Sequence, residues 1–360
     1  MTLTIVATTP KGIVLGADSR CSHKIEPSIK KEAKFKLDDY YFNDNYTKIF
    51  PLTHYIACTI AGSIQWTDPT SSKKDVNIDV LETTRGFEVK KTDEQSISEV
   101  TRSFAEYLEE QYKIEAQLAK LKQDFEETLK KGCEEEGCEV KEIELLGGPY
   151  NVKSLYESFY PPGLLAHVVK KDGEKSRVYF PLPQSDFLIA GYHGEKDSIP
   201  KVFQVTVPPG DCFELTGDSS LVGSPKNTNR YGIHYSGDKR VVDWLTRYRY
   251  YRLTDVLYGV KFKSWPGLED IDGKKLETLF KKIRPKGNDI NWTEVDLENA
   301  TSIVASMIEA TKILQKDFDK ICFDKKRENP NSVGGLPDIA TITPEAGFQW
   351  HTKKGVRQKG

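Results

Sequence analysis

The amino-acid sequence predicts an α+β protein in which antiparallel sheets are layered with helices. Strand-like runs come first. Helical periodicity, further strands, a second helical stretch and a final strand follow, so strands and helices do not alternate as they do in parallel βαβ folds. Hydrophobic residues make up 38% of the 360-residue chain and charged residues 29%, which is typical of a packed core beneath a charged surface.

The N-terminal strands are indicated by β-branched runs that turn residues separate. Residues 2–9 and 13–20 flank a Pro-Lys-Gly turn, which is a hairpin signal. Residues 47–52 and 55–62 form a second candidate pair of strands. Residues 64–95 are polar, and we expect a loop with a short helix there.

Two stretches have the spacing of amphipathic helices. Residues 97–131 carry apolar side chains near the helical period with Lys and Glu between them, and residues 296–318 show the same periodicity. The apolar face of residues 97–131 is explained by packing on the protein's own core, and docking of another protein is the alternative.

The remaining strands are expected in the second half of the chain. Residues 186–194 and 200–211 predict a hairpin, and residues 230–245 read as a strand that runs into a helix. Residues 337–343 predict a last strand, and a basic tail is expected from His351 onward.

Net charge and cysteine usage exclude several classes of protein. The formal net charge of −2 gives no reason to expect nucleic acid or an anionic membrane as a partner. No apolar run approaches the roughly 20 residues that span a bilayer. The chain does not open with a secretory signal, so we expect a cytoplasmic protein. Six scattered cysteines without a His/Cys cluster favour reduced thiols, and we expect neither a metal nor a cofactor.

Thr2 stands at the start of the first predicted strand and becomes the N-terminal residue once Met1 is removed. A hydroxyl is a weak nucleophile unless a base takes its proton. A free α-amino group, with an unperturbed pKa of about 7.7–8.0, can act as that base directly or through one water. This chemistry also needs a cation, a carboxylate that holds the cation, and a backbone N–H that faces the developing oxyanion.

The opening TLTIVATTPKGIVLGADSR resembles the first hairpin of catalytic proteasome β-subunits, which are N-terminal-nucleophile hydrolases. Asp18 lies sixteen residues after Thr2, as the family's carboxylate follows its nucleophile. Lys48 in TKIFPL and Gly62 in CTIAGS match the family's lysine and its oxyanion-binding glycine. The resemblance therefore implies that Thr2 is the nucleophile, Asp18 holds Lys48, and the Gly62 N–H stabilises the oxyanion.

Two later segments resemble the same family. YSGDKRVVDWL places Ser236 where a serine lies close to the nucleophile and its amine, and NPNSVGGLPDIATIT places Ser332 on the family's second serine. Asn329 stands where the family has an aspartate that orients the neighbouring serine and amine. Asn keeps a hydrogen-bonding shape but loses the charge.

The resemblance also implies how substrate is bound. Cys21, Ile60 and Ile64 would line the pocket for the substrate residue before the cut, and these small or apolar side chains favour uncharged substrate residues. Arg20 would brace the active-site backbone.

The fold that the resemblance implies is a four-layer α-β-β-α sandwich. We expect one domain over residues 1–360, with insertions at about 114–183 and 255–291. A homo-oligomer, as a ring or a related assembly, is the expected quaternary structure.

These observations predict a threonine-type amide hydrolase whose substrates are peptides or proteins. One alternative is a small-molecule amidase or acylase of the same superfamily, because fold does not fix substrate. The other is a non-catalytic scaffold subunit that assembles through its charged insertions. Retained Met1 would favour the scaffold, because a blocked amine cannot be the base.

Overall fold

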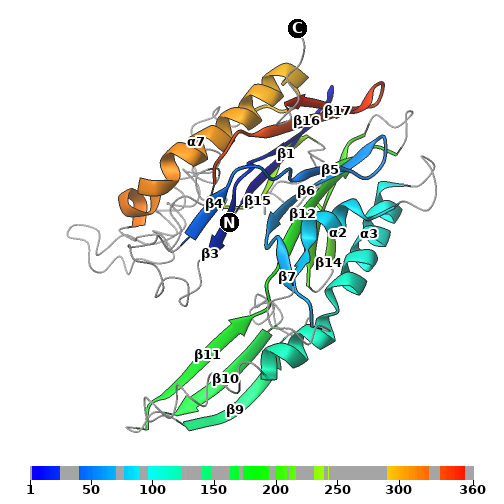
Figure 1. The fold of residues 1–360 in the computed structure, drawn as a ribbon. Helices are drawn as coiled ribbons and strands as arrows, with labels where there is room; N and C mark the ends of the chain where they lie inside the picture. The colour runs from blue at the N-terminus through cyan, green and yellow to red at the C-terminus, as the bar shows by residue number, and fades with distance from the viewer. Residues whose placement is uncertain are drawn as a thin grey trace, which may run out of the picture.

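The structure of the chain is a computed structural model, and it shows a mixed α/β protein with several antiparallel sheets and few helices (Figure 1). The residues that it describes are 2–24, 40–69, 77–88, 96–123, 126, 139–146, 163–169, 173–193, 199–208, 211–215, 231–238, 242, 290–323 and 333–352. No helix within these ranges is long and apolar enough to cross a membrane.

The first large sheet contains the N-terminal strand. Its strand order is β15-β1-β2-β16-β17, and every neighbouring pair is antiparallel. The strands are β1 (Leu3–Thr9), β2 (Gly12–Ala17), β15 (Gly232–Gly237), β16 (Asp338–Thr343) and β17 (Gly347–Thr352). Strand β1 thus lies between its hairpin partner and a strand more than 200 positions later in the sequence.

Strand β17 corrects one sequence prediction, because the segment that includes His351 was expected to be only a basic tail. Gly347 has a φ of 64°, in the left-handed region, so the chain turns back after β16. Phe348 and Trp350 then stack edge to face, with their ring centroids 5.3 Å apart. These features form a hairpin that the Lys- and Arg-rich composition of the last residues hides.

The second large sheet has the strand order β14-β13-β12-β6-β5 and is also antiparallel. Its strands are β5 (Ile49–Pro51), β6 (Ile56–Gly62), β12 (Ser185–Gly191), β13 (Lys201–Val207) and β14 (Asp211–Glu214). The hairpin expected from residues 186–194 and 200–211 is the β12–β13 pair.

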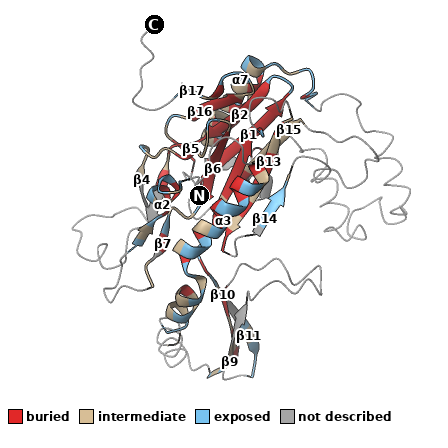
Figure 2. Cartoon of the chain, turned by 90° about the vertical axis from the view of Figure 1, so that its right-hand side faces the viewer, coloured by how far each residue is buried: buried red, intermediate tan, exposed pale blue. Residues whose placement is uncertain are grey.

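Apolar side chains join the two sheets and their helices. Val6 and Leu15 of the first sheet share a buried cluster with Ala57 and Leu188 of the second. Helix α7 (Leu297–Phe323) packs on the other face of the first sheet. Strands β1, β2 and β6 are buried over most of their length, as Figure 2 shows.

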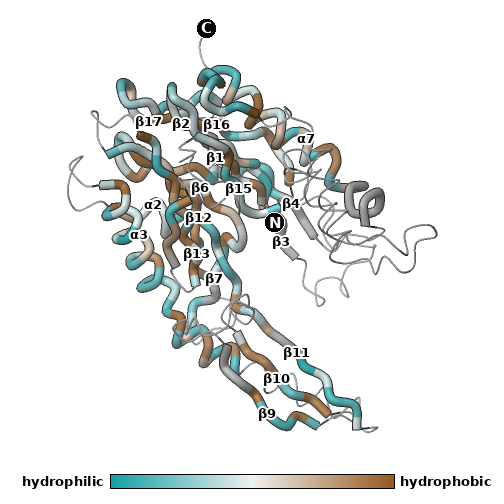
Figure 3. The backbone as a smooth tube through the Cα atoms, turned by 180° about the vertical axis from the view of Figure 1, so that it is seen from behind, coloured by the Kyte–Doolittle hydropathy of each residue, from teal (hydrophilic) through white to brown (hydrophobic). Residues whose placement is uncertain are grey.

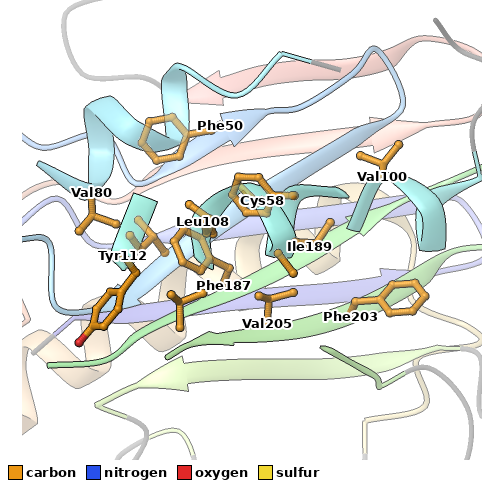
Figure 4. Packing of buried hydrophobic residues seen from close by; sticks show 14 of the residues in the cluster. Phe50, Cys58, Val80, Val100, Leu108, Tyr112, Phe187, Ile189, Phe203 and Val205 are labelled. Carbon is orange, nitrogen blue, oxygen red and sulfur yellow. The ribbon is translucent and has the colours of Figure 1, made fainter. Parts of the chain in front are cut away.

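Helix α3 (Ile97–Tyr112) covers the outer face of the second sheet (Figure 4). Its Phe104 ring packs edge to face on Phe187 of β12, with the centroids 5.3 Å apart. A capping box between Ser96 and Glu99 begins the helix. The face of α3 that the sequence left open between core packing and a partner protein is buried in this core.

Helix α3 is shorter than the single helix expected over residues 97–131. It ends at Lys113, whose φ of 53° is left-handed, and residues 114–123 form a further helical segment. Lysine carries no glycine-like signal for such a turn, so the apolar periodicity concealed the break. Residues 127–131 lie outside the described part of the chain.

Smaller elements fill the region around residues 64–95. The short helix expected there is α2 (Val80–Arg85), which Asp79 caps through its side chain. Strands β7 (Gln65–Thr67) and β8 (Asn77–Asp79) pair beside it, and β3 (Cys21–Lys24) pairs with β4 (Tyr40–Asn43).

A three-stranded sheet extends away from the two large sheets, and we call it the arm (Figures 1 and 3). It consists of β9 (Glu139–Leu146), β10 (Gly163–Val169) and β11 (Lys175–Pro181). Leu164, Ala166 and Val168 are buried on one face, and Leu121 packs against them. The arm lies inside the predicted insertion at 114–183; most of the second insertion, 255–291, lies outside the described residues.

Candidate active site

Thr2 is held in place immediately before β1. It is only 2% exposed, and the Asp238 N–H donates to its carbonyl oxygen at 2.7 Å. Gly237 has a φ of 91°, and a Cβ there would lie 1.7 Å from the same carbonyl oxygen, so this position requires glycine. Thr2 is therefore fixed to β15 and does not fray as residues near a terminus often do.

Lys48 lies just before β5, and its side chain is fully buried. Its ammonium donates to Thr2 Oγ1 at 2.7 Å, to Asp18 Oδ1 at 3.0 Å and to the Arg20 carbonyl. An ammonium has three protons, so these three acceptors satisfy it completely. A cation is thus placed directly against the hydroxyl of Thr2.

Asp18 follows β2 and is 1% exposed. Its carboxylate accepts hydrogen bonds from the backbone N–H groups of Leu3 at 3.0 Å, Arg20 at 3.2 Å and Gly334 at 3.1 Å, in addition to the bond from Lys48. The antiparallel register of the first hairpin, in which Thr4 opposes Ala17, puts the carboxylate beside the start of β1. The hairpin therefore fixes the geometry of the cation and the hydroxyl.

This arrangement can activate the Thr2 hydroxyl. An ammonium at hydrogen-bond distance stabilises the alkoxide that forms when the hydroxyl loses its proton. The ion pair is buried, so water does not screen the interaction between Lys48 and the developing charge.

Gly62 ends β6 with a φ of 86°, and a Cβ there would lie 2.5 Å from the Gln184 carbonyl oxygen. The neighbouring Ala61 lies near the start of β1, since a Cβ on Gly237 would be 3.2 Å from the Ala61 Cβ. The structure therefore brings the end of β6 close to Thr2. The oxyanion role of the Gly62 N–H stays a prediction.

Ser236 lies on β15 directly opposite Thr4 and is 6% exposed. Side chains alternate along a strand, so Thr2, Thr4 and Ser236 share one face of the sheet. The Ser236 hydroxyl donates to Asp186 Oδ2 of the second sheet at 3.1 Å. Ser332 and Asn329 lie outside the described residues, although Gly334, just beyond them, donates to Asp18.

The Arg20 side chain contacts Asp44 and Gly334. Its guanidinium makes two hydrogen bonds to Asp44, with Nε to Oδ1 at 2.6 Å and the second pair at 2.7 Å. A Cβ on Gly334 would lie 2.3 Å from Arg20 Cζ, so the guanidinium lies directly against that glycine. The side chain thus connects the segment after β2 with the turn before β16.

The three expected pocket residues lie in two places. Cys21 is buried beside the ion pair, and burial raises the pKa of its thiol to about 11, while the charge of Lys48 opposes that shift. Ile60 is fully buried and Ile64 partly buried in the apolar cluster between the second sheet and α3. Their contact with substrate stays a prediction.

Sequence reasoning missed Asp186 and Thr206, which face the site from the second sheet. Thr206 donates to Asp186 Oδ1 at 2.7 Å. The signal was available in DFLIAG, where a carboxylate precedes a run of apolar residues at the start of a predicted strand. A carboxylate at such a position needs donors from other segments. Within the described ranges, no group of His, Cys, Asp and Glu side chains could hold a metal ion.

Comparisons with known proteins give little independent evidence. No family model and no curated protein matches the sequence. Among solved structures, the Anbu (Gly-1) mutant from Hyphomicrobium sp. strain MC1 aligns with 100% of this chain and 89% of that chain, at a TM-score of 0.40 and 11% identity. Similarity this low carries no argument about function.

Proposed function

We propose that the chain is a threonine-type amide hydrolase that cleaves peptides or proteins with Thr2 as its nucleophile. The observation that supports this most directly is the buried Lys48 ammonium, 2.7 Å from Thr2 Oγ1 and held by Asp18. A fully buried cation next to a weak nucleophile is typical of an activated hydroxyl.

The catalytic cycle begins once Met1 has been removed. The α-amine of Thr2 accepts the hydroxyl proton, directly, through a water or through Ser236, and the oxygen attacks the substrate carbonyl. The Gly62 N–H stabilises the tetrahedral oxyanion. The amine then gives its proton to the leaving amine, and water hydrolyses the ester that remains on Thr2. The cycle uses no metal or organic cofactor.

A purely structural reading of the Lys48–Asp18 pair explains the site less well. Burying a charged side chain costs roughly several kcal/mol per ion, and the attraction between the two ions often does not offset that cost. An apolar pair would stabilise the fold equally well, whereas activation of Thr2 requires the charge. The third N–H of the Lys48 ammonium donates to the Thr2 hydroxyl. Once Met1 is removed, Thr2 also carries the α-amine that can act as the base.

We propose, with this function, the four-layer α-β-β-α sandwich of N-terminal-nucleophile hydrolases. The packing of α7 and α3 on the outer faces of two facing sheets supports it. The proposal treats residues 1–360 as one domain with the insertions at 114–183 and 255–291, and as a subunit of a homo-oligomer.

The test is hydrolysis of a panel of fluorogenic peptides and acylated amines by the wild-type chain and two variants. Thr2→Ala removes the nucleophile and should abolish turnover without unfolding the protein. Thr293→Ala removes an exposed threonine hydroxyl that donates to Asn291 Oδ1, and should keep full activity. Equal turnover by Thr2→Ala and wild type would contradict the mechanism, and cleavage of acylated amines alone would identify a small-molecule amidase.

A further inference from the structure

The N-terminal end of β12 contacts the segment that follows Gly62 and, through Asp186, strand β15. The Gln184 carbonyl accepts the Ser63 N–H at 2.7 Å. The Ser185 hydroxyl donates to the Ser63 carbonyl and accepts from Trp66 Nε1 at 3.0 Å. These bonds fix the backbone that follows Gly62. The next residue, Asp186, is bonded to Ser236 of the first sheet.

Asp186 connects the second sheet to the first. In the sheet register it lies opposite Thr206 of β13 and Ala61 of β6. One carboxylate oxygen accepts from Thr206 at 2.7 Å, and the other accepts from Ser236 at 3.1 Å. Ser236 belongs to β15 of the first sheet, so this hydrogen bond crosses from one sheet to the other beside Thr2.

The bond to Asp186 determines what Ser236 can do. A serine hydroxyl has one proton and two acceptor lone pairs, and the proton normally rotates to suit its surroundings. A carboxylate accepts and never donates when ionised, so it takes this proton. Ser236 then presents only lone pairs to its other neighbours on the face that it shares with Thr2. Of the three routes for the Thr2 hydroxyl proton, the direct route and the route through a water therefore remain.

We propose that Asp186 is a positioning residue of the hydrolytic site, which holds Ser236 as a hydrogen-bond acceptor for the α-amine of Thr2. Ser236 fixed in this way orients the protonated amine toward the leaving group. This inference rests on the proposed function. Asp186 acts through Ser236, which distinguishes this role from one in which it merely joins the two sheets.

The experiment measures the rate at which a peptide epoxyketone modifies Thr2, by intact mass and mapping of the N-terminal peptide. Asp186→Ala frees the Ser236 hydroxyl and should slow modification about tenfold, which is less than the roughly 10²–10⁴-fold that a proton-transfer group itself contributes, because Asp186 acts only through Ser236. Asp186→Asn keeps an acceptor oxygen for the Ser236 hydroxyl, and its NH₂ group can donate to the Thr206 hydroxyl oxygen. This variant should therefore recover most of the rate.

A double-mutant cycle separates positioning from structure. If Asp186 acts through Ser236, Ser236→Ala should slow modification as much as Asp186→Ala, and the double variant should be no slower than either. Glu214→Gln is the matched control, because it removes one carboxylate from the exposed ion pair with Lys201 on the same sheet. Its rate should equal that of the wild-type chain.

Two results would overturn the inference alone: additive effects of Asp186→Ala and Ser236→Ala, or equal losses in Asp186→Asn and Asp186→Ala, with the wild-type chain still modified. Absence of modification in the wild-type chain would overturn the proposed function and this inference together. Thermal unfolding checks each variant. If Asp186→Ala does not fold, Asp186→Leu, which has a similar shape and no acceptor, replaces it in the cycle.

Discussion

The candidate site and the arm are held together in opposite ways. At the site, the polar residues Thr2, Asp18 and Lys48 are at most 2% exposed and are fixed by hydrogen bonds. In the arm, a small apolar cluster that includes Leu164 joins three strands. Apolar burial stabilises a sheet at no electrostatic cost, whereas buried charges carry a desolvation cost. The contrast supports the proposal that the polar cluster serves chemistry, whereas the apolar cluster of the arm serves stability.

The largest effect is expected from removing the charge of Lys48. Lys48→Met should abolish modification of Thr2, because nothing then stabilises the alkoxide. It should also lower the free energy of unfolding by about 3–5 kcal/mol, since Asp18 stays buried without its cation. Lys201→Met, which breaks an exposed ion pair, should change it by less than about 1 kcal/mol. Chemical denaturation measures the free energy of unfolding of both variants. Equal losses of that free energy would show that burying the Lys48–Asp18 pair costs no more than exposing an ion pair to solvent.

Strand β15 offers a matched pair of glycine substitutions. Gly237→Ala should displace Thr2 and destabilise the protein by about 1–3 kcal/mol, because the new Cβ meets the Thr2 carbonyl and the backbone is left-handed. Gly232→Ala, with nothing within 4 Å of its Cβ, should leave Thr2 reactive. Thermal unfolding and Thr2 modification are the readouts. A reactive Gly237→Ala variant would mean that the site does not depend on this close approach.

A substitution in the core of the arm should destabilise the arm without affecting the candidate site. Leu164→Ala removes a fully buried side chain from a small core, at a local cost of about 2–5 kcal/mol. We expect faster hydrogen exchange in β9, β10 and β11, with an unchanged rate of Thr2 modification. Leu188→Ala, the same change between the two large sheets, should instead speed exchange in those sheets. Loss of Thr2 reactivity in Leu164→Ala would show that the arm supports the site.

The smallest effect concerns Cys21. Its thiol pKa of about 11 means that little thiolate exists near pH 8, so alkylation should be slow and should accelerate as the pH rises toward 11. The exposed Cys212 should react before Cys21. Lys48 lowers the pKa of Cys21, so Lys48→Met should raise it and slow alkylation further. Peptide mapping after iodoacetamide treatment measures these rates, and an unchanged Cys21 rate in Lys48→Met would contradict the electrostatic link.

The sequence predicted the polar cluster because its geometry is mostly local. A tight hairpin brings Asp18 back to the start of β1, and the strand that ends at Gly62 follows Lys48 closely. Spacing along the chain therefore carried the information. The contact between Asp186 and Ser236 could not be predicted in this way, because it depends on how two separate sheets face each other.

Other features were hidden for different reasons. The arm strands have seven or eight residues each, but they lie inside a segment of mixed composition, so their alternation was weak. The break in the helix at Lys113 depends on a left-handed residue that is not glycine. The predictions for Ser332 and Asn329 stay predictions, because those residues lie outside the described part of the chain.

The proposed function requires Thr2 to be a free, activated N-terminal nucleophile. Intact mass spectrometry after incubation with an epoxyketone, followed by mapping of the N-terminal peptide, tests it most directly. We expect a chain that lacks Met1 and carries one adduct on Thr2, with no adduct on Thr2→Ala. A wild-type chain that retains Met1, or one that has lost Met1 and carries no adduct, would contradict it.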